Sequence, residues 1–159
     1  MHPPFLDLST PAARRAALLY HGVTPAEVAG ISAAQLAAIH GLALEDLAAA
    51  RFDAALDRLS FLVQQDPWER RYQVGLAHAL QALGQWEAAG RFFAEALLTD
   101  ATDALCAYRA GECLGAMGDL AAAREAFETA LALSWIDPEQ VPVREAARQR
   151  LDHLAALGA

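Results

Sequence analysis

The sequence has 159 residues, of which 55% are hydrophobic, and alanine and leucine are the commonest. A chain of this length can form one domain with its own core, and the alanine-rich composition favours an all-helical fold over a sheet. The net charge is −8 and the pI is about 5.0. We therefore expect no nucleic-acid binding and no stable membrane association, because phosphate backbones and anionic lipid surfaces repel an acidic protein.

Residues 1–35 are expected to form a helical N-terminal extension. The opening string MHPPFLDLSTPAARR lacks the basic start and apolar run of a signal peptide, which favours a cytoplasmic protein. No apolar run approaches the roughly 18 residues of a membrane span. Thr24 with Glu27, and Ser32 with Gln35, have the spacing of capping boxes, so each pair predicts a helix start.

The middle of the chain contains an internal repeat. The string ALGQWEAAGRFFAEAL at 82–97 returns 34 residues later as AMGDLAAAREAFETAL at 116–131, and a weaker copy, AAARFDAALDRLSFLV, occupies 48–63. The copies share small residues and a large apolar residue in register, as two closely packed helices require. This spacing is typical of the tetratricopeptide repeat. It predicts three helix-turn-helix units, at 36–69, 70–103 and 104–137, stacked into a right-handed solenoid.

The helix limits are predicted most fully for the second unit. Asp66 and Pro67 are expected to cap and begin its first helix, which would end near Leu83. Gly84 would form the turn, because glycine adopts positive φ without a side-chain penalty. The second helix would run over about 86–98. Residues 138–159 are expected to form a C-terminal cap, with its helix at 143–157.

The sequence contains no recognisable catalytic, cofactor-binding or metal-binding motif. The five histidines are scattered, and no zinc, phosphate-loop or nucleophile-elbow pattern occurs. Cys106 and Cys113 would share a helix face, too far apart for a mutual disulfide, and are expected to be free buried thiols. We therefore predict that the protein is not an enzyme and needs no cofactor or metal.

The functional surface expected for such a solenoid is its inner wall, formed by the first helix of each unit. In the first unit the wall would consist of Ala37, His40, Leu44, Leu47 and Ala48, which is apolar for a surface. Either the N-terminal helices or a second copy bury these leucines, or they form a groove for an extended apolar peptide. The clamp by which related solenoids hold chaperone C-termini is not expected, because it uses lysine and asparagine, and the sequence has neither.

Four segments resemble the class II chaperones of bacterial type III secretion, which guard hydrophobic translocator proteins. They are the Gly-Val-Thr segment at 22–24, IS…L at 31–36, RFDAAL…QQD at 51–66, and YQVGLAHALQALGQW at 72–86; the string AGECLGAMGDLAAA at 110–123 also follows the family pattern. The likeness spans roughly 15–135. A generic tetratricopeptide scaffold that joins cytoplasmic proteins is the alternative interpretation.

The resemblance implies a cytoplasmic homodimer that holds a segment of its translocator client in the groove before export. The implied peptide contacts are His40, Leu44, Leu47, Phe52, Leu62, Arg71, Val74 and His78, to which the wall position Tyr108 is added. The implied dimerisation residues are Leu18, Leu19, Tyr20, Val23 and Ile31.

Overall fold

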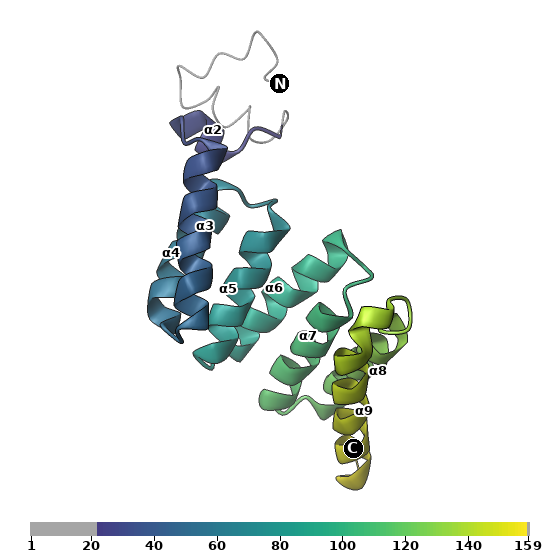
Figure 1. The fold of residues 1–159 in the computed structure, drawn as a ribbon. Helices are drawn as coiled ribbons and strands as arrows, with labels where there is room; N and C mark the ends of the chain where they lie inside the picture. The colour runs from purple at the N-terminus through teal and green to yellow at the C-terminus, as the bar shows by residue number, and fades with distance from the viewer. Residues whose placement is uncertain (1–21, 159) are drawn as a thin grey trace.

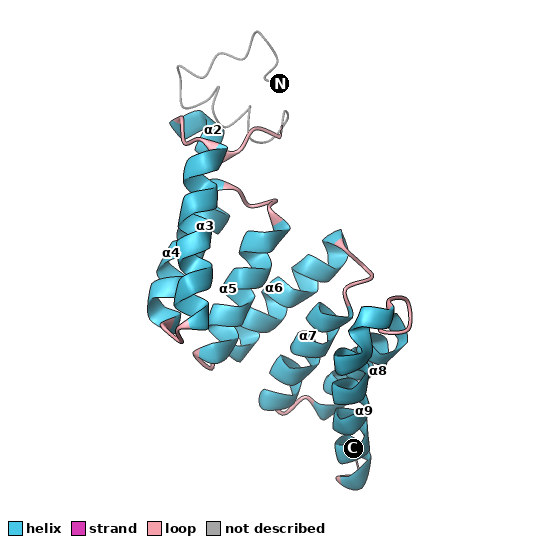
Figure 2. Cartoon of the chain, in the orientation of Figure 1, coloured by secondary structure: helices cyan, strands magenta, loops and turns pink. Residues whose placement is uncertain are grey.

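The computed structural model describes residues 22–158, which form eight α-helices and one short 3-10 helix, with no strand among them (Figure 1 and Figure 2). The elements are α2 (Pro25–Ala29), α3 (Ala33–Ala48), α4 (Phe52–Gln65), α5 (Arg70–Ala82), α6 (Trp86–Thr99), α7 (Ala104–Ala116), α8 (Leu120–Leu133), η1 (Pro138–Gln140) and α9 (Val141–Ala156). None of the helices within this part of the chain is both long and apolar enough to cross a membrane.

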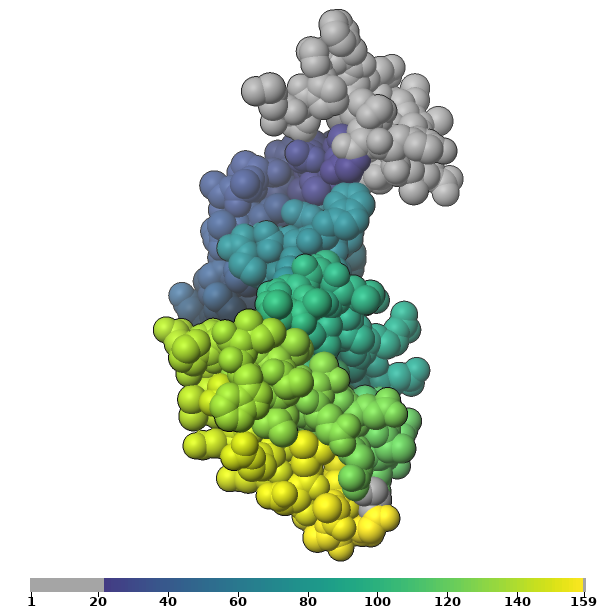
Figure 3. Space-filling model, turned by 90° about the vertical axis from the view of Figure 1, so that its right-hand side faces the viewer, coloured from purple at the N-terminus to yellow at the C-terminus, as the bar shows by residue number. Residues whose placement is uncertain are grey.

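From α3 onward the α-helices pack in chain order, each against the next, so the pairs α3–α4, α5–α6 and α7–α8 follow one another along the molecule. Helix α9 lies against α8 and also touches α7. The space-filling view shows the resulting elongated body (Figure 3). The predicted all-helical solenoid of tetratricopeptide helix pairs is confirmed.

The repeated string builds the core between the helices. Three sets of residues spaced by 34 are almost completely buried: Ala55, Ala89 and Ala123; Leu59, Phe93 and Phe127; and Leu62, Ala96 and Ala130. The alanines allow the helices to approach closely, and the larger side chains fill the space beside them. The recurring buried residues are therefore a packing pattern that joins the helices.

The turn inside each helix pair uses a left-handed residue. Gly84 and Gly118 have φ of 73° and 86°, and Ala50 holds the same position in the first pair at 55°. Ala50 is the only non-glycine residue with positive φ among residues 22–158. In each turn the next residue donates its backbone N–H back into the first helix, as Gln85 does to Leu80 at 2.9 Å. These bonds satisfy carbonyls at the helix end and fix the turn.

Helices α2 and α3, which precede or begin the repeats, start where the sequence predicts. Both predicted capping boxes are confirmed. The backbone N–H of Thr24 donates to the Glu27 carboxylate at 2.8 Å, and that of Ser32 donates to the Gln35 amide oxygen at 2.9 Å. The hydroxyl groups accept the reciprocal bonds. Each box satisfies donors that a helix N-terminus otherwise leaves unpaired.

The predicted start of α5 is wrong. Asp66 is the C-cap of α4, and its carboxylate accepts the backbone N–H of Trp68 at 3.3 Å, which stabilises the turn instead of beginning a helix. The N-cap is Glu69, which accepts the backbone N–H of Arg71 at 3.1 Å. The final helix also begins two residues earlier than predicted, at Val141, directly after η1.

Candidate functional site

The inner wall is formed by α3, α5 and α7, and its residues recur at a spacing of 34. Leu44 of α3 corresponds to His78 of α5 and to Glu112 of α7. Leu44 is 48% exposed, whereas the other two are partly buried. The three helices therefore present an apolar side chain, an imidazole and a carboxylate at equivalent places on one face.

A first hollow, of about 410 Å³, lies on this face between the first two helix pairs and α7. It is lined by Leu47, Phe52, His78, Gln81, Ala82 and Arg109. Leu47 packs partly against the core, and His78 meets the ring of Phe93 edge-on, with 5.2 Å between ring centroids. Burial, and then the charge of Arg109, lowers the pKa of His78. The lowered pKa favours the uncharged imidazole, so His78 adds no full charge to the apolar side that Leu47 and Phe52 form.

The wall above the first hollow carries a second histidine beside an ion pair. The rings of His40 and Tyr72 are 5.1 Å apart, and Arg71 pairs with Glu69 at 3.0 Å. Burial, and then the charge of Arg71, lowers the pKa of His40. The His40–Tyr72 contact therefore joins α3 to α5, whereas the Arg71–Glu69 pair lies within the start of α5.

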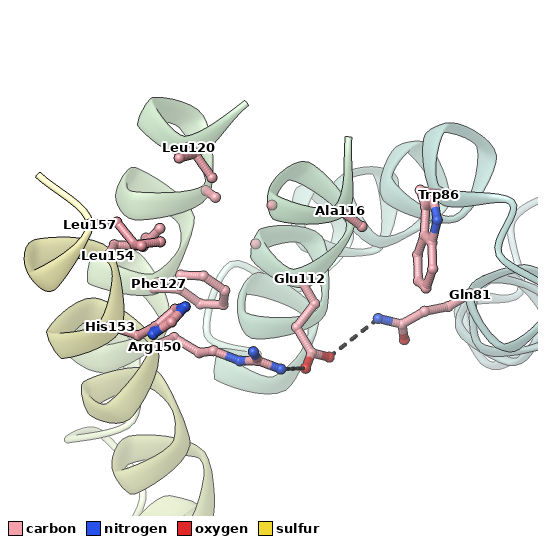
Figure 4. Close-up of a pocket in the computed structure, with 13 residues that line it drawn as sticks. Gln81, Trp86, Glu112, Ala116, Leu120, Phe127, Arg150, His153, Leu154 and Leu157 are labelled. Atoms are coloured by element: carbon pink, nitrogen blue, oxygen red, sulfur yellow. Dashed lines mark hydrogen bonds and ion pairs between the residues drawn. The ribbon is translucent and has the colours of Figure 1, made fainter. Parts of the chain in front are cut away.

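A second hollow, of about 570 Å³, lies between α7, α8 and α9 and opens toward the corner of α5 and α6 (Figure 4). Its apolar lining consists of Trp86, Gly111, Gly115, Ala116, Leu120, Ala123, Phe127, Leu154 and Leu157, and its polar lining of Gln81, Glu112, Arg150 and His153. Gln81 belongs to both hollows, so the two are neighbours along the wall.

A polar network centred on Glu112 crosses the wall where the two hollows meet. Its carboxylate accepts bonds from Gln81 at 3.3 Å, Tyr108 at 3.1 Å, Arg109 at 2.8 Å and Arg150 at 2.9 Å. Burial alone would raise the pKa of Glu112, but the bonds from Arg109 and Arg150 outweigh it and keep that pKa below its usual value. Two arginines therefore share one carboxylate, and this part of an acidic protein carries a local positive charge.

The structure brings together part of the predicted peptide site. Leu47, Phe52 and His78 line the first hollow, and Tyr108 belongs to the polar network beside it. The predicted peptide contact at Leu62 is wrong, because its side chain is 0% exposed and fills the core between helices, where no peptide can reach it.

The other predicted contacts lie outside the two hollows. Val74 packs partly against the core, while His40, Leu44 and Arg71 lie on the first two wall helices. Sequence reasoning missed Arg109, which the equivalent positions of the repeat do not mark, and Arg150, which comes from the last helix.

The predicted dimerisation residues fall into two groups. Leu18, Leu19 and Tyr20 lie outside the described residues. Val23 is 4% exposed, so it is a core residue of its own chain and not a surface available to a second copy. Ile31 also packs partly against the core of its own chain.

Residues 22–158 bring together no group of three histidine, cysteine or acidic side chains that could hold a metal ion. Cys106 and Cys113 are free and buried, as predicted. Burial raises the pKa of Cys106 to about 12 and that of Cys113 to about 11. Both thiols are therefore protonated and serve as packing groups.

The comparisons with known proteins agree with this geometry. The tetratricopeptide-repeat family model matches residues 46–111. A type III secretion complex from Aeromonas hydrophila contains a chain with a TM-score of 0.85 and 27% identity, over 94% of this chain and 98% of that one. No curated protein gives a significant match to the sequence.

Two further solved structures are similar to this chain. PcrH, a protein of Pseudomonas aeruginosa, in complex with the chaperone binding region of PopD, has a TM-score of 0.78 and 27% identity, over 82% of this chain and 98% of that one. The type III secretion translocator chaperone SycD of Yersinia enterocolitica has a TM-score of 0.73 and 25% identity, over 82% of this chain and 97% of that one. The resemblance to translocator chaperones predicted from the sequence is confirmed.

Proposed function

We propose that this chain is a type III secretion chaperone that binds a hydrophobic translocator protein through an extended client segment on its inner wall. The observation that carries the proposal is the first hollow, in which Leu47, Phe52 and Ala82 form an apolar side on the wall of this chain. The chain is similar to PcrH, which was crystallised with the chaperone binding region of PopD. An extended peptide can place alternate side chains in such a hollow while its backbone follows the wall helices.

The charge of the chain suits the same role. A translocator with long apolar segments aggregates unless those segments are covered, and a partner with net charge −8 keeps the complex soluble through repulsion between complexes. Stoichiometric binding shifts the client toward its bound state by mass action, so the cycle needs neither nucleotide nor catalysis. In this proposal the protein acts as a cytoplasmic binding partner and not as an enzyme.

A matched pair of substitutions tests the groove. Leu44→Glu puts a charge on the inner wall one helical turn before Leu47 of the first hollow, whereas Leu98→Glu puts the same charge on α6, where the leucine is 87% exposed. We expect Leu44→Glu to abolish co-purification with a co-expressed translocator from the same genome and Leu98→Glu to leave it intact. Circular dichroism should show unchanged helicity in both variants. Equal co-purification by both would exclude the groove assignment.

The alternative, a general tetratricopeptide scaffold, makes a different prediction. A scaffold would bind cytoplasmic proteins on the same wall, and no hydrophobic secreted protein would depend on it for solubility. Expression of each translocator with and without this chain separates the two functions. A translocator that stays soluble without the chain would favour the scaffold.

We also propose that the protein is a homodimer, as its resemblance to the family implies. Because Val23 is buried within one chain, the contact between copies would rest on the other implied residues, which are Leu18, Leu19, Tyr20 and the partly exposed Ile31. Sedimentation velocity of the wild type and of Leu19→Asp tests this. A monomeric wild type would exclude the homodimer.

A further inference from the structure

We infer that the second hollow, between α7, α8 and α9, is a separate anchor site for a bulky apolar side chain of the same client segment. This inference rests on the proposed function, because it assigns the second hollow to that client. The hollow has about 570 Å³, a volume within the range of ligand sites, and Phe127 and Leu154 form buried parts of its lining. At its mouth, Trp86 is 37% and Leu157 60% exposed (Figure 4).

Glycine in α7 supports the inference, because the fold requires it at one position and not at the other. A Cβ on Gly111 would lie 2.8 Å from the ring of Phe127, so packing demands glycine there. A Cβ on Gly115 would meet only Ala123, at 3.8 Å, which is ordinary contact. Glycine inside a helix costs about 0.5–1 kcal/mol relative to alanine. Gly115 therefore lowers stability without a packing reason, and its effect is to leave the second hollow open.

The repeat shows what Gly115 replaces. The equivalent wall positions in the first two units are Leu47 and Gln81, both of which project side chains into the first hollow. Because the third unit has glycine at that position and Ala116 beside it, the wall is recessed, and Phe127 can be reached from the surface of the groove. A client side chain would occupy the space that the missing wall side chain leaves.

The polar edge of the second hollow suits a peptide backbone. The amide nitrogen of Gln81 is held by Glu112, while its amide oxygen accepts no bond from any described residue. Arg150 binds Glu112 and Tyr108 through two of its three nitrogens. An acceptor and a donor therefore remain at the edge of the hollow, and they can pair with the N–H and C=O groups of an extended chain.

The continuity of the two hollows along the wall indicates that the same client segment occupies both. Gln81 lines both hollows, so a segment that fills the first hollow and continues in the direction of α9 enters the second. A leucine, methionine or phenylalanine side chain matches the lining, and alternate residues of an extended segment point toward the same wall.

The test uses two alanines at equivalent repeat positions and a third, exposed alanine as the control. Ala116→Leu fills the second hollow, Ala82→Leu fills the first, and Ala94→Leu adds the same group to the exposed outer side of α6. Overlapping synthetic peptides that cover the translocator serve as probes in titration calorimetry. We expect the tightest peptide to bind Ala116→Leu and Ala82→Leu about tenfold or more weakly, and Ala94→Leu like the wild type.

Trp86 lines the second hollow and not the first, so its emission distinguishes between these two hollows. In a Trp68→Phe, Trp135→Phe background it is the remaining tryptophan, and the two replaced side chains are exposed. Peptide binding should shift its emission to shorter wavelength, because a side chain entering the second hollow removes water from the indole. Gly115→Leu should prevent the shift, and a urea transition like that of the wild type would establish that this variant is folded.

Each outcome decides between the inference and its premise. Normal peptide binding by Ala116→Leu and Gly115→Leu, with unchanged Trp86 emission, would overturn the second site while leaving the proposed function intact. Absence of binding by the wild type would overturn the proposed function itself. A change in oligomeric state of client-free Ala116→Leu would assign the second hollow to another copy of the chain and would also overturn the inference.

Discussion

Replacing Ala50 by glycine should stabilise this protein. Ala50 has φ of 55°, in the left-handed region where a Cβ crowds the backbone, and it occupies the turn position that Gly84 and Gly118 hold in the other two helix pairs. The strain costs an L-residue about 1–2 kcal/mol, which glycine avoids. Ala50 is exposed, so the lost methyl group removes little buried surface.

The expected gain is smaller than the strain because glycine also stabilises the unfolded chain. The added backbone freedom offsets about 0.5–1 kcal/mol. The net increase in the free energy of unfolding is therefore about 0.5–1 kcal/mol. For a domain of this size, that corresponds to a rise in Tm of about 2 °C.

Urea unfolding followed by circular dichroism measures the effect, with two controls. Ala94→Gly, at an exposed interior position of α6, should lose about 1 kcal/mol. Gly84→Ala should lose a similar amount through strain alone, because its Cβ would only reach ordinary contact with Trp86, at 4.0 Å. If Ala50→Gly lost as much stability as Ala94→Gly, positive φ would not be a significant cost at this turn.

Three further outcomes follow from the packing. Gly111→Ala should lower the free energy of unfolding by about 1–3 kcal/mol, measured in urea, because its Cβ would lie 2.8 Å from the Phe127 ring. Burial, and next the charge of Arg109, lowers the pKa of His78 in the folded chain. In the unfolded chain the imidazole of His78 is protonated near the ordinary histidine pKa of about 6.5, whereas in the folded chain it is protonated only at lower pH. The free energy of unfolding should therefore fall as the pH drops below about 6.5, and His78→Gln should lose less of it. Cys106, whose pKa burial raises to about 12, should react with a thiol reagent only after denaturant is added.

The repeat made most of the fold predictable because its information is local. A small residue at Ala89 and a large one at Phe93 recur at a fixed spacing, and such a pattern is satisfied only when the two helices of a pair meet there. The capping boxes are equally local, since each involves residues three apart. The start of α5 was harder to predict because Asp66 and Glu69 both offer a carboxylate to backbone N–H groups, and only the turn between them decides which one caps the helix.

Leu62 shows how a likeness can mislead where the residues themselves are informative. The family resemblance implies that Leu62 contacts the peptide. Its equivalents at the spacing of 34 are Ala96 and Ala130, and both are fully buried. The repeat places all three at the contact between helices. The spacing within the chain was thus the better guide to which face of α4 this leucine occupies.

The second hollow could not be predicted from the repeat, because one of its walls comes from outside the repeat. Arg150 reaches Glu112 across 38 residues of sequence, and that contact depends on how α9 packs against α8 and α7. A helix that only capped the solenoid would need an apolar side toward α8 and a polar side toward water. Helix α9 also turns Arg150, His153 and Leu157 toward the inner wall, where they border the recess at Gly115. Helix α9 therefore lines part of the second hollow as well as covering α8, and under the proposed function its inward side chains are where selectivity for the client should be altered.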